Sequence, residues 1–522
     1  MKKHCTRSML VAVVLLASLA LFAQGAKEPA GPTTIELWYG AAVTEAGPPP
    51  SDWVGFEIIR EKLGIELKLT ALPSNESDQD VKVQAAAAAN NLPDLFMVRR
   101  DVLGRLVPQG LIAPVDDLYA KMPVRTANHY DAVSKSHARI GGKTYGLADP
   151  GSIMKNEGLL IRKDWLDNLG LEIPKTTDEL LTVMRAFSFN DPDGNGRNDT
   201  WGYGAFQEIN NYEAWPGRRL EPLFGAFGVD GTWSLEETGA GLNLLKPEFY
   251  DAMLFLKQIA DEGIIDPNWL SYKKDDFRAA WKQGRFGIMR EQNAAFAAQS
   301  NYAPFDKNFP QGNWVIIDPP KGPQGKASIG PYTANFRIYA ISAKAAKEGK
   351  TDKIAALLEW MASEEGYYLL GWGVEGVNYT KDANGIPVAA NLPNADLAFS
   401  APGGQTVTQL RNMVFYNGDI ELYARYPKYT TEVSKKEMSA LAVLREMQTK
   451  AWTAQIGSDT LPIPNADLKR FYEQGLSEFI TGKRSLTPAA WSKWLDEFKR
   501  LGGQDWNDKG VAFARENNLL TN

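Results

Sequence analysis

The sequence predicts an α/β protein with two domains, because strand-like and helix-like segments alternate along a chain that is long enough for both. The clearest alternation covers residues 34–98, where three apolar strand patterns are separated by two helical patterns. This β-α-β-α-β order is typical of a parallel sheet covered by helices. About 497 of the 522 residues remain after a predicted N-terminal signal, which is enough for two or more domains.

The first domain is predicted from five short segments. Strands show alternating or continuous apolar side chains, and helices show a helical stripe or an alanine-rich run. In order, they are a strand at 34–38, a helix at 52–63, a strand at 65–69, a helix at 81–89 and a strand at 95–98. Ligands of open α/β sheets bind beyond the carboxyl ends of the strands. The candidate contacts at those ends are Trp38, Tyr39, Arg99 and Arg100.

The second domain is predicted to begin near Gly146. Thr176 and Glu179 have the spacing of a capping box, which opens a helix that runs to about Phe187. The other predicted elements are a strand at 159–162, a helix at 163–168, a helix from Pro247 with the apolar stripe Phe249, Met253, Leu256 and Ala260, and a helix at 488–501. Three tryptophans on predicted helices are expected in the core rather than in a site: Trp165, Trp360 and Trp494.

The N-terminus has the pattern of a secretory signal peptide. Three basic residues precede the apolar run 9–22, which is too short to span a bilayer, and Ala23 and Gly25 offer the small residues of a cleavage site. Residues 1–25 are therefore expected to be removed on export. The only cysteine, Cys5, lies within them, so we expect no disulfide and no lipidation of the mature chain. The sequence predicts a periplasmic, extracytoplasmic protein.

The net charge and the aromatic content limit the classes of ligand that the protein is expected to bind. The formal net charge of −6 becomes about −9 when three basic residues leave with the signal. Such a surface does not favour nucleic acid, which needs clustered Lys and Arg. The 15 Trp, 19 Tyr and 22 Phe are mostly core residues, but an excess of Trp and Tyr in an exported protein also suits sugars. Their flat faces stack on sugar rings while their polar edges serve hydroxyls.

Residues 191–199 have the spacing of a calcium-binding loop. Side-chain oxygens stand at Asp191, Asp193, Asn195 and Asp199, and the carbonyl of Arg197 can add another. Alternate side chains of such a loop point inward and wrap a hard cation. The sequence therefore predicts one structural calcium ion, Ca²⁺, at these five residues.

The loop departs from a complete EF-hand at its end. Gly202 stands at the twelfth position, where a bidentate Glu is expected, and residues 201–204 do not start a helix. The pattern favours a static calcium site over a sensor, and its alternative is a solvated turn rich in Asp, Asn and Gly.

Seven segments along the chain carry a resemblance to a known family. They are residues 92–96, 142–147, 160–170, 191–199, 262–267, 371–379 and 494–503. On these segments the chain resembles the extracellular solute-binding proteins of ABC importers, in their large carbohydrate-binding group. Within that group it is similar to the alginate-type oligosaccharide binders and their lipoprotein relatives. The missing lipidation cysteine departs from the lipoprotein members and favours a freely soluble form.

The resemblance implies a two-lobe periplasmic-binding-protein clamshell. Two α/β lobes are joined by several hinge crossings, and the sugar is held in the cleft between them. It implies an N-terminal lobe of residues 33–148 plus about 335–370, and a C-terminal lobe of residues 149–334 plus about 371–522 that carries the calcium loop. It also implies membrane permease subunits as partners, and we expect a monomer.

The chemistry-bearing motifs of enzymes are absent from the sequence. The mature chain has two histidines, His129 and His137, whose spacing suits no shared metal site, and it lacks the Gly-x-Ser-x-Gly motif. A glycosidase needs two facing carboxylates, which no local motif marks. The sequence favours a non-enzymatic binder of a neutral or acidic oligosaccharide. The alternatives are a secreted polysaccharide-degrading enzyme and a binding protein that serves a sensor.

Two loops carry the aromatic and charged residues that a sugar site needs. Trp372 and Tyr379 flank Glu375 among glycines, which predicts a stacking face beside a carboxylate for hydroxyls. The alternative is that Trp372 packs between the lobes. Trp215 and Arg218 lie in a turn-rich segment, where ligand contact is favoured over a buried helical role.

Further candidates lie at strand ends and at a predicted hinge crossing. Asp94, Arg99 and Asp149 are candidate partners for hydroxyls or for a carboxylate, although Asp94 also suits a cap and Arg99 a solvated surface. Tyr332 and Asn335 lie where the chain is expected to cross between lobes, so both are predicted to face the cleft. An acidic sugar would pair its carboxylate with an arginine of this set.

Overall fold

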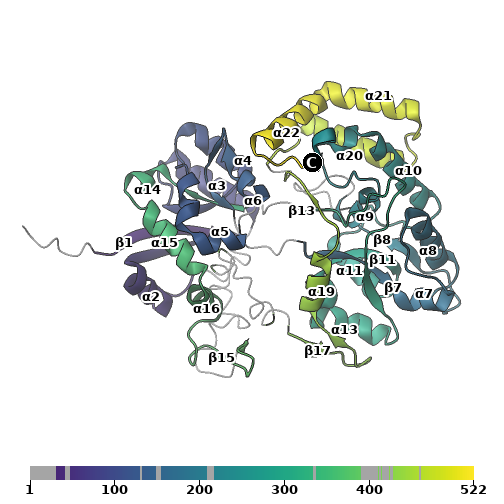
Figure 1. The fold of residues 1–522 in the computed structure, drawn as a ribbon, viewed down its shortest axis with the longest axis horizontal. Coiled ribbons are helices and arrows are strands. Elements are labelled where there is room, and N and C mark those ends of the chain that lie inside the picture. Colours follow the sequence, from purple (N-terminus) through teal and green to yellow (C-terminus); the bar gives the residue numbers. More distant parts are fainter. Residues whose placement is uncertain are drawn as a thin grey trace, which may run out of the picture.

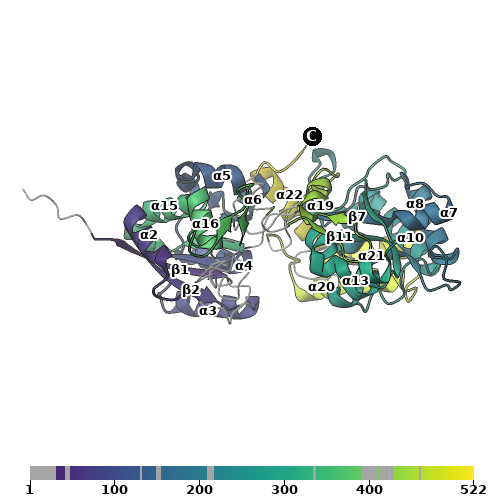
Figure 2. The same cartoon turned by 90° about the horizontal axis from the view of Figure 1, so that it is seen from below.

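The computed structural model forms two lobes that lie side by side in both views (Figures 1 and 2). It describes residues 31–40, 48–73, 75–129, 132–148, 155–207, 217–332, 337–388, 410, 413, 423, 427–457 and 460–521. Each lobe has one central sheet and its own hydrophobic core. Among the helices of this described part, none is long and apolar enough to cross a membrane.

The N-terminal lobe is built on a five-stranded sheet. Its strands in spatial order are β2 (Ile65–Leu72), β1 (Thr33–Gly40), β3 (Leu95–Arg99), β14 (Arg337–Ile341) and β6 (Leu147–Ala148). β1 pairs in parallel with both β2 and β3, as the β-α-β-α-β order predicts, whereas β14 is antiparallel to β3 and β6. A strand from beyond residue 330 therefore completes the sheet that the first 100 residues begin.

Helices cover both faces of this sheet. They are α2 (Val54–Leu63), α3 (Glu76–Ala88), α4 (Arg100–Leu106), α5 (Pro123–His129), α6 (Ala132–His137), α14 (Ala343–Lys347), α15 (Thr351–Met361) and α16 (Glu364–Trp372). α2 ends because Gly64 adopts a left-handed conformation and donates its N–H to the carbonyl of Arg60. α3 begins five residues before its predicted start, because Asn75 caps it by accepting from the N–H groups of Ser77 and Asp78.

The C-terminal lobe has a mixed four-stranded sheet. Its order is β12 (Trp314–Ile317), β7 (Glu157–Arg162), β11 (Phe286–Gln292) and β8 (Trp201–Gly204). β7 runs antiparallel to both of its neighbours, and β8 is parallel to β11. β7 is buried along its whole length, so the charged residues at its two ends need partners inside the protein.

The helices of this lobe surround the sheet. They are α7 (Lys163–Leu169), α8 (Thr177–Phe189), α9 (Glu221–Gly225), α10 (Pro247–Asp261), α11 (Lys274–Lys282), α12 (Asn293–Ala297), α13 (Gln299–Asn308), α19 (Ala440–Gln448), α20 (Ala466–Ile480), α21 (Pro488–Phe498) and α22 (Gln504–Glu516). α21 ends near its predicted end, because Gly502 breaks the helical geometry with a φ of 119° before α22 begins. Short 3-10 turns include η4 (Arg218–Leu220).

Five pairs of two-residue strands complete the described part of the fold. β13 (Pro331–Tyr332) pairs in parallel with β19 (Thr453–Ala454), and Figure 1 places β13 between the two lobes. The other short strands are β4 (Arg139–Ile140), β5 (Lys143–Thr144), β9 (Trp233–Ser234), β10 (Gly241–Leu242), β15 (Thr380–Lys381), β16 (Pro387–Val388), β17 (Tyr429–Thr430) and β18 (Glu437–Met438).

Several local predictions can be compared directly with the structure. The hydroxyl of Thr176 caps α8 by accepting from the N–H of Glu179 at 3.2 Å, and the carboxylate of Glu179 accepts from the N–H of Lys175. Trp165 and Trp494 are fully buried, as predicted. Trp360 packs against the N-terminal core but is only half-buried, and its indole N–H donates to Glu365 at the surface.

The second lobe boundary lies later than predicted. Residue 370 falls inside α16, and the ring of Tyr379 stacks on Tyr368 of that helix with centroids 5.9 Å apart. Leu369, Leu370 and Val374 pack into the N-terminal core. The N-terminal lobe therefore continues at least to Tyr379, because the aromatic side chains after residue 370 complete its core.

Candidate ligand-binding site

Two segments that connect the lobes meet at the edge of the C-terminal lobe. Lys155 lies just before β7, and Tyr332 lies in β13. The ammonium of Lys155 stands 4.4 Å from the centre of the Tyr332 ring, which is a cation–π contact. The structure thus places Tyr332 beside a connection between lobes, where the sequence predicts it.

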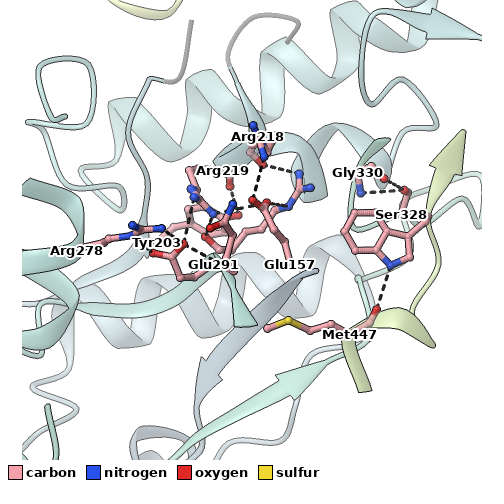
Figure 3. A network of polar contacts seen from close by, with 12 residues as sticks. Glu157, Tyr203, Arg218, Arg219, Arg278, Glu291, Ser328, Gly330 and Met447 are labelled. Atoms are coloured by element: carbon pink, nitrogen blue, oxygen red, sulfur yellow. Dashed lines mark hydrogen bonds and ion pairs between the residues drawn. The ribbon is translucent and has the colours of Figure 1, made fainter. Parts of the chain in front are cut away.

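A group of buried charged side chains, here called the hinge-side ion cluster, lies directly behind this edge (Figure 3). Glu157 begins β7 with 2% of its surface exposed. One of its carboxylate oxygens, Oε2, is 2.9 Å from Arg290 Nε and 3.6 Å from Arg219 Nη1. The other, Oε1, is 3.4 Å from Arg218 Nη1. Burial alone would raise the pKa of Glu157, but Arg219, Arg290 and Arg218 outweigh it and hold the pKa at about 2.

A second buried carboxylate extends the cluster. Glu291 of β11 is 3.1 Å from Arg219 Nη2 and 3.1 Å from Arg278 Nε. The phenol of Tyr203 donates to the carbonyl of Arg219 at 2.7 Å, and burial raises the pKa of this phenol. The cluster therefore fixes η4 against three strands of the sheet.

Arg218 is the most exposed member of the cluster. Its side chain is 31% exposed, whereas its carbonyl accepts from Arg290 Nη1 at 2.7 Å. The preceding Gly217 has a φ of 101°, which turns the chain into η4. Buried contacts thus hold the backbone of Arg218 while its guanidinium is partly exposed. This arrangement is suited to binding hydroxyl or carboxylate oxygens of a ligand.

A pocket of about 380 Å³ lies in the same lobe beside β13 and β19. Tyr332 and Trp452 give it aromatic surface, and Asp230 and Lys155 give it charge. Asp230 is buried and accepts from the hydroxyl of Ser328 at 3.0 Å, and burial raises its pKa. Aromatic faces next to a few fixed polar groups are the combination that a sugar ring needs.

The predicted stacking face at residues 372–379 is packed more tightly than expected. Trp372 is 4% exposed and forms an aromatic cluster with Tyr367, Tyr368 and Tyr379 in the N-terminal lobe. Such packing favours a structural role for Trp372, although within the N-terminal lobe and not between the lobes as the alternative had it. Glu375 is exposed and pairs with Lys381, with Nζ and Oε2 3.2 Å apart.

The residues predicted as ligand contacts at the strand ends are buried or already have protein partners within the N-terminal lobe. Tyr39 is wrong as a ligand contact, because it is fully buried in the core, and burial raises its pKa to about 12. The carboxylate of Asp94 pairs with Lys350 Nζ at 2.9 Å and accepts from the N–H of Glu36 in β1, so it is held by distant partners and does not cap a helix or a turn. Arg99 is not a solvated residue, since it forms an ion pair with Asp80. Trp38 donates its indole N–H to Glu36.

The remaining predicted ligand contacts, Asp149, Trp215 and Asn335, lie outside the described residues. The residues that the sequence did not single out are Glu157, Arg219, Arg290 and Asp230. For two of them, Glu157 and Arg290, the sequence offers a local signal, because each is a charged residue in an otherwise apolar strand.

The predicted calcium loop folds as a tight turn between α8 and β8. Asp191 accepts from the N–H groups of Asn195 and Gly196, at 3.0 and 2.9 Å. The amide of Asn195 donates to both Asp193 and Asp199, at 3.0 and 3.1 Å. Burial and the neighbouring carboxylates raise the pKa of Asp193. In the described part of the chain, no group of three or more His, Cys, Asp or Glu side chains has the geometry to hold a metal.

The residues of the loop nevertheless fit a cation. Two carboxylates already converge on the Asn195 amide, and turning that amide over would direct its oxygen toward the same point. The N–H of Arg197 donates to Asn195 Oδ1 at 2.8 Å, so the backbone already curls around the Asn195 side chain.

Comparisons with known proteins agree with this architecture. Residues 41–368 match the family described as bacterial extracellular solute-binding protein. The polygalacturonan/rhamnogalacturonan-binding protein YtcQ of Bacillus subtilis is 29% identical over 372 residues, which cover 68% of this chain and 69% of YtcQ. The lipoprotein LipO of the same organism is 25% identical over 456 residues, 85% of each chain.

The fold is also similar to a solved structure. The substrate-binding protein FusA of Streptococcus pneumoniae, in complex with kestose, aligns with a TM-score of 0.57 and 19% identity. The alignment covers 94% of this chain and 99% of FusA. This likeness concerns the two-lobe fold.

Proposed function

The chain belongs to the bacterial extracellular solute-binding protein family, and we propose on this basis that it captures an oligosaccharide and delivers it to the permease of an ABC importer. The family and the two-lobe α/β fold that the sequence predicted are confirmed. The alternative of a secreted polysaccharide-degrading enzyme is not favoured, since the relatives are binding proteins.

One observation carries the proposal for a sugar. The pocket beside β13 and β19 combines the rings of Tyr332 and Trp452 with the charged groups of Asp230 and Lys155. A sugar has apolar faces and a rim of hydroxyls, so its burial requires both kinds of partner. The name of the relative YtcQ, a polygalacturonan/rhamnogalacturonan-binding protein, supports the same ligand class.

Isothermal titration with defined tetrasaccharides tests this function. The probes are tetragalacturonate, maltotetraose and nystose, with the monosaccharides galacturonate and glucose as controls. Saturable binding of at least one tetrasaccharide, far tighter than its monosaccharide, is expected. Binding of none of them while free amino acids bind would overturn the proposal. A reducing-end assay in the same mixtures tests the absence of catalysis, because turnover would make the protein an enzyme.

Ligand is expected to close the two lobes. Closure is favoured only when one ligand contacts both lobes, because the contacts made in the closed state alone supply the free energy. Small-angle scattering should show a smaller radius of gyration at saturating tetrasaccharide. An unchanged scattering curve at saturation would contradict the clamshell mechanism.

We further propose one structural calcium ion at Asp191, Asp193, Asn195, Asp199 and the carbonyl of Arg197. The convergence of carboxylates on the Asn195 amide supports it. The ion would hold the turn between α8 and β8 in the C-terminal lobe, away from the sugar.

The place of action is proposed from the N-terminal sequence and the family. An apolar run with a cleavage site supports export, and the position of Cys5 before that run supports a mature chain without a lipid. Mass spectrometry of the exported protein tests both, since a lipid would add several hundred daltons. Size-exclusion chromatography with light scattering tests the monomer.

A further inference from the structure

Three chain segments that join the lobes, or run between them, converge on Arg290. This residue lies in β11 with 1% of its surface exposed. A fully buried guanidinium is costly unless each of its faces and edges has a partner. The partners of Arg290 come from segments far apart in sequence, and Figure 3 shows three of them, Glu157, Arg218 and Gly330, close together.

The first segment enters the C-terminal lobe at β7. Glu157 is its first strand residue, and its carboxylate lies 2.9 Å from Arg290 Nε. The neighbouring Asn156 accepts through its carbonyl from the N–H of Asn293, just beyond β11. The start of this segment is therefore tied to the strand that carries Arg290.

The second segment leaves the lobe through Gly330 and β13. Gly330 has a φ of 135° and lies against the guanidinium so closely that a Cβ there would be 2.5 Å from Arg290 Nη1. A contact below 3.0 Å requires one of the two groups to move. Glycine is needed at this position both for the backbone conformation and for the approach of Arg290.

The third segment runs from Trp452 through β19. The Trp452 ring lies over the Arg290 guanidinium, with 5.5 Å from Cζ to the ring centroid. β19 pairs in parallel with β13, and the segment continues to Thr460, whose hydroxyl is 2.7 Å from Nδ1 of His137 in the N-terminal lobe. The residue stacked on Arg290 is thus linked to the other lobe.

Arg290 also holds the segment that carries Arg218. Its Nη1 donates to the carbonyl of Arg218 at 2.7 Å, and its own carbonyl accepts from Arg219 Nη1 at 2.9 Å. One guanidinium therefore contacts the segment entering the lobe, the segment leaving it, the segment paired with β13, and η4.

We propose that Arg290 is a positioning residue that couples the arrangement of the two lobes to the position of η4 and Arg218. The inference rests on the proposed function in one respect. A sugar bound at η4 would act on lobe closure through Arg290. A movement of η4 shifts the guanidinium, and the guanidinium cannot shift without moving Gly330 or Trp452. If the contacts of Arg290 only stabilised the fold, disrupting them would lower stability and leave the lobe arrangement unchanged.

The experiment measures the distance between lobes without any ligand. Spin labels are placed at Val81→Cys on α3 and Leu254→Cys on α10, both exposed, in a chain whose one native cysteine is replaced by Cys5→Ser. Double electron–electron resonance then gives the distribution of distances between the lobes. The test variant is Gly330→Ala, which pushes a methyl group against the guanidinium.

The chain offers a matched control in Gly241→Ala. Gly241 has a φ of 143°, and a Cβ there would lie 2.5 Å from Asn507 Oδ1, so the backbone strain and the clash are similar. It lies in β10 of the same lobe, away from Arg290. We expect Gly330→Ala to shift the mean distance by more than the half-width of the unsubstituted distribution, and Gly241→Ala to leave it in place. Equal distributions in all three proteins would overturn the inference.

A second variant separates Arg290 from its neighbour. Arg290→Lys keeps a positive charge near Glu157 but loses the planar fork that also reaches the Arg218 carbonyl. It should shift the distribution as Gly330→Ala does. A shift in Gly330→Ala alone would show that Gly330 acts without Arg290, and the assignment would fall. If Arg290→Lys shows no cooperative melting, it is not folded, and the distance distribution of Gly330→Ala alone then tests the inference. Failure of the sugar titrations leaves this ligand-free readout intact, so the two proposals fail separately.

Discussion

The loop at residues 191–199 and the hinge-side ion cluster both gather charged side chains, but they balance charge in opposite ways. The loop brings three carboxylates together within nine residues, and most of its partners are its own backbone N–H groups and one amide. The cluster pairs the buried carboxylates of Glu157 and Glu291 with guanidinium groups, and its members are spread over residues 157 to 291. The loop is exposed and local, whereas the cluster is buried and assembled by the fold.

This difference indicates where each region finds the positive charge that balances its carboxylates. Burial and the neighbouring carboxylates raise the pKa of Asp193, and a cation from solvent would relieve the repulsion between these carboxylates. In the cluster the protein supplies the counter-charge, which is why the pKa of Glu157 is lowered. The loop is therefore expected to respond to ions, and the cluster to substitution and to acid.

The largest effect is expected from Glu157→Gln. The substitution keeps the shape of the side chain but leaves Arg290 and Arg219 without their shared carboxylate. Breaking a buried ion pair by removing one partner costs about 3–5 kcal/mol of the free energy of unfolding. Urea denaturation measures it. The control is Glu497→Gln, which removes the exposed pair with Arg500 and should leave the free energy of unfolding almost unchanged. Equal costs for the two variants would show that burial does not decide the strength of the cluster.

Acid should remove part of the contribution that Glu157 makes to the free energy of unfolding. The pKa of Glu157 is about 2 in the folded protein and 4.5 in its ordinary state, so the unfolded chain binds the proton more tightly. Its contribution to the free energy of unfolding is complete above about pH 4.5 and is lost as the pH falls toward 2. The unsubstituted protein should lose more stability over this range than Glu157→Gln. Parallel losses in the two proteins would place the acid sensitivity elsewhere.

The two regions also show what the sequence can predict. The loop was predicted from spacing alone because all its members lie within nine residues, and α2, α8 and α10 were predicted because apolar stripes and caps are local signals. Glu157, Arg219 and Arg290 come together only when β7, β11 and η4 pack, and no local pattern encodes that. Tyr39 was misplaced for a related reason, since the end of a strand does not reveal whether its side chain faces the core.

Calcium should produce the next largest effect. An ion that binds only the folded state stabilises by about 2.7 kcal/mol at 100 times its Kd, so a chelator should lower the melting temperature by several degrees. Asp193→Asn should abolish the difference between calcium and chelator. Asp382→Asn is the matched control, because Asp382 also caps a turn through the N–H groups of Asn384 and Ile386 but lies among fewer oxygens. If the chelator leaves melting unchanged and no metal copurifies, the loop is only a turn.

A smaller effect, on affinity rather than stability, is expected at the pocket. Tyr332→Ala removes a partly exposed ring that lines it, so binding of the tetrasaccharide identified by titration should weaken by about 1–2 kcal/mol, which is about 5- to 30-fold in Kd. The melting temperature without ligand should change little. Tyr332→Phe keeps the ring and should retain most of the affinity if stacking dominates. Unchanged titrations of Tyr332→Ala would place the sugar away from this pocket.

The smallest effect is expected from Glu375→Gln, at the exposed pair between Glu375 and Lys381. Exposed ion pairs contribute about 0–1 kcal/mol, since water screens the charges and the side chains lose freedom on pairing. Stability should therefore remain within about 0.5 kcal/mol of the unsubstituted protein, as measured by urea denaturation. Affinity decides whether the residue matters for function. Glu375 was predicted as an acceptor for sugar hydroxyls, and its carboxylate lies on the N-terminal lobe, so it is suited to hold a ligand only after closure. A loss of affinity without a loss of stability would therefore extend the site across both lobes, whereas unchanged affinity would restrict it to the hinge-side edge of the C-terminal lobe.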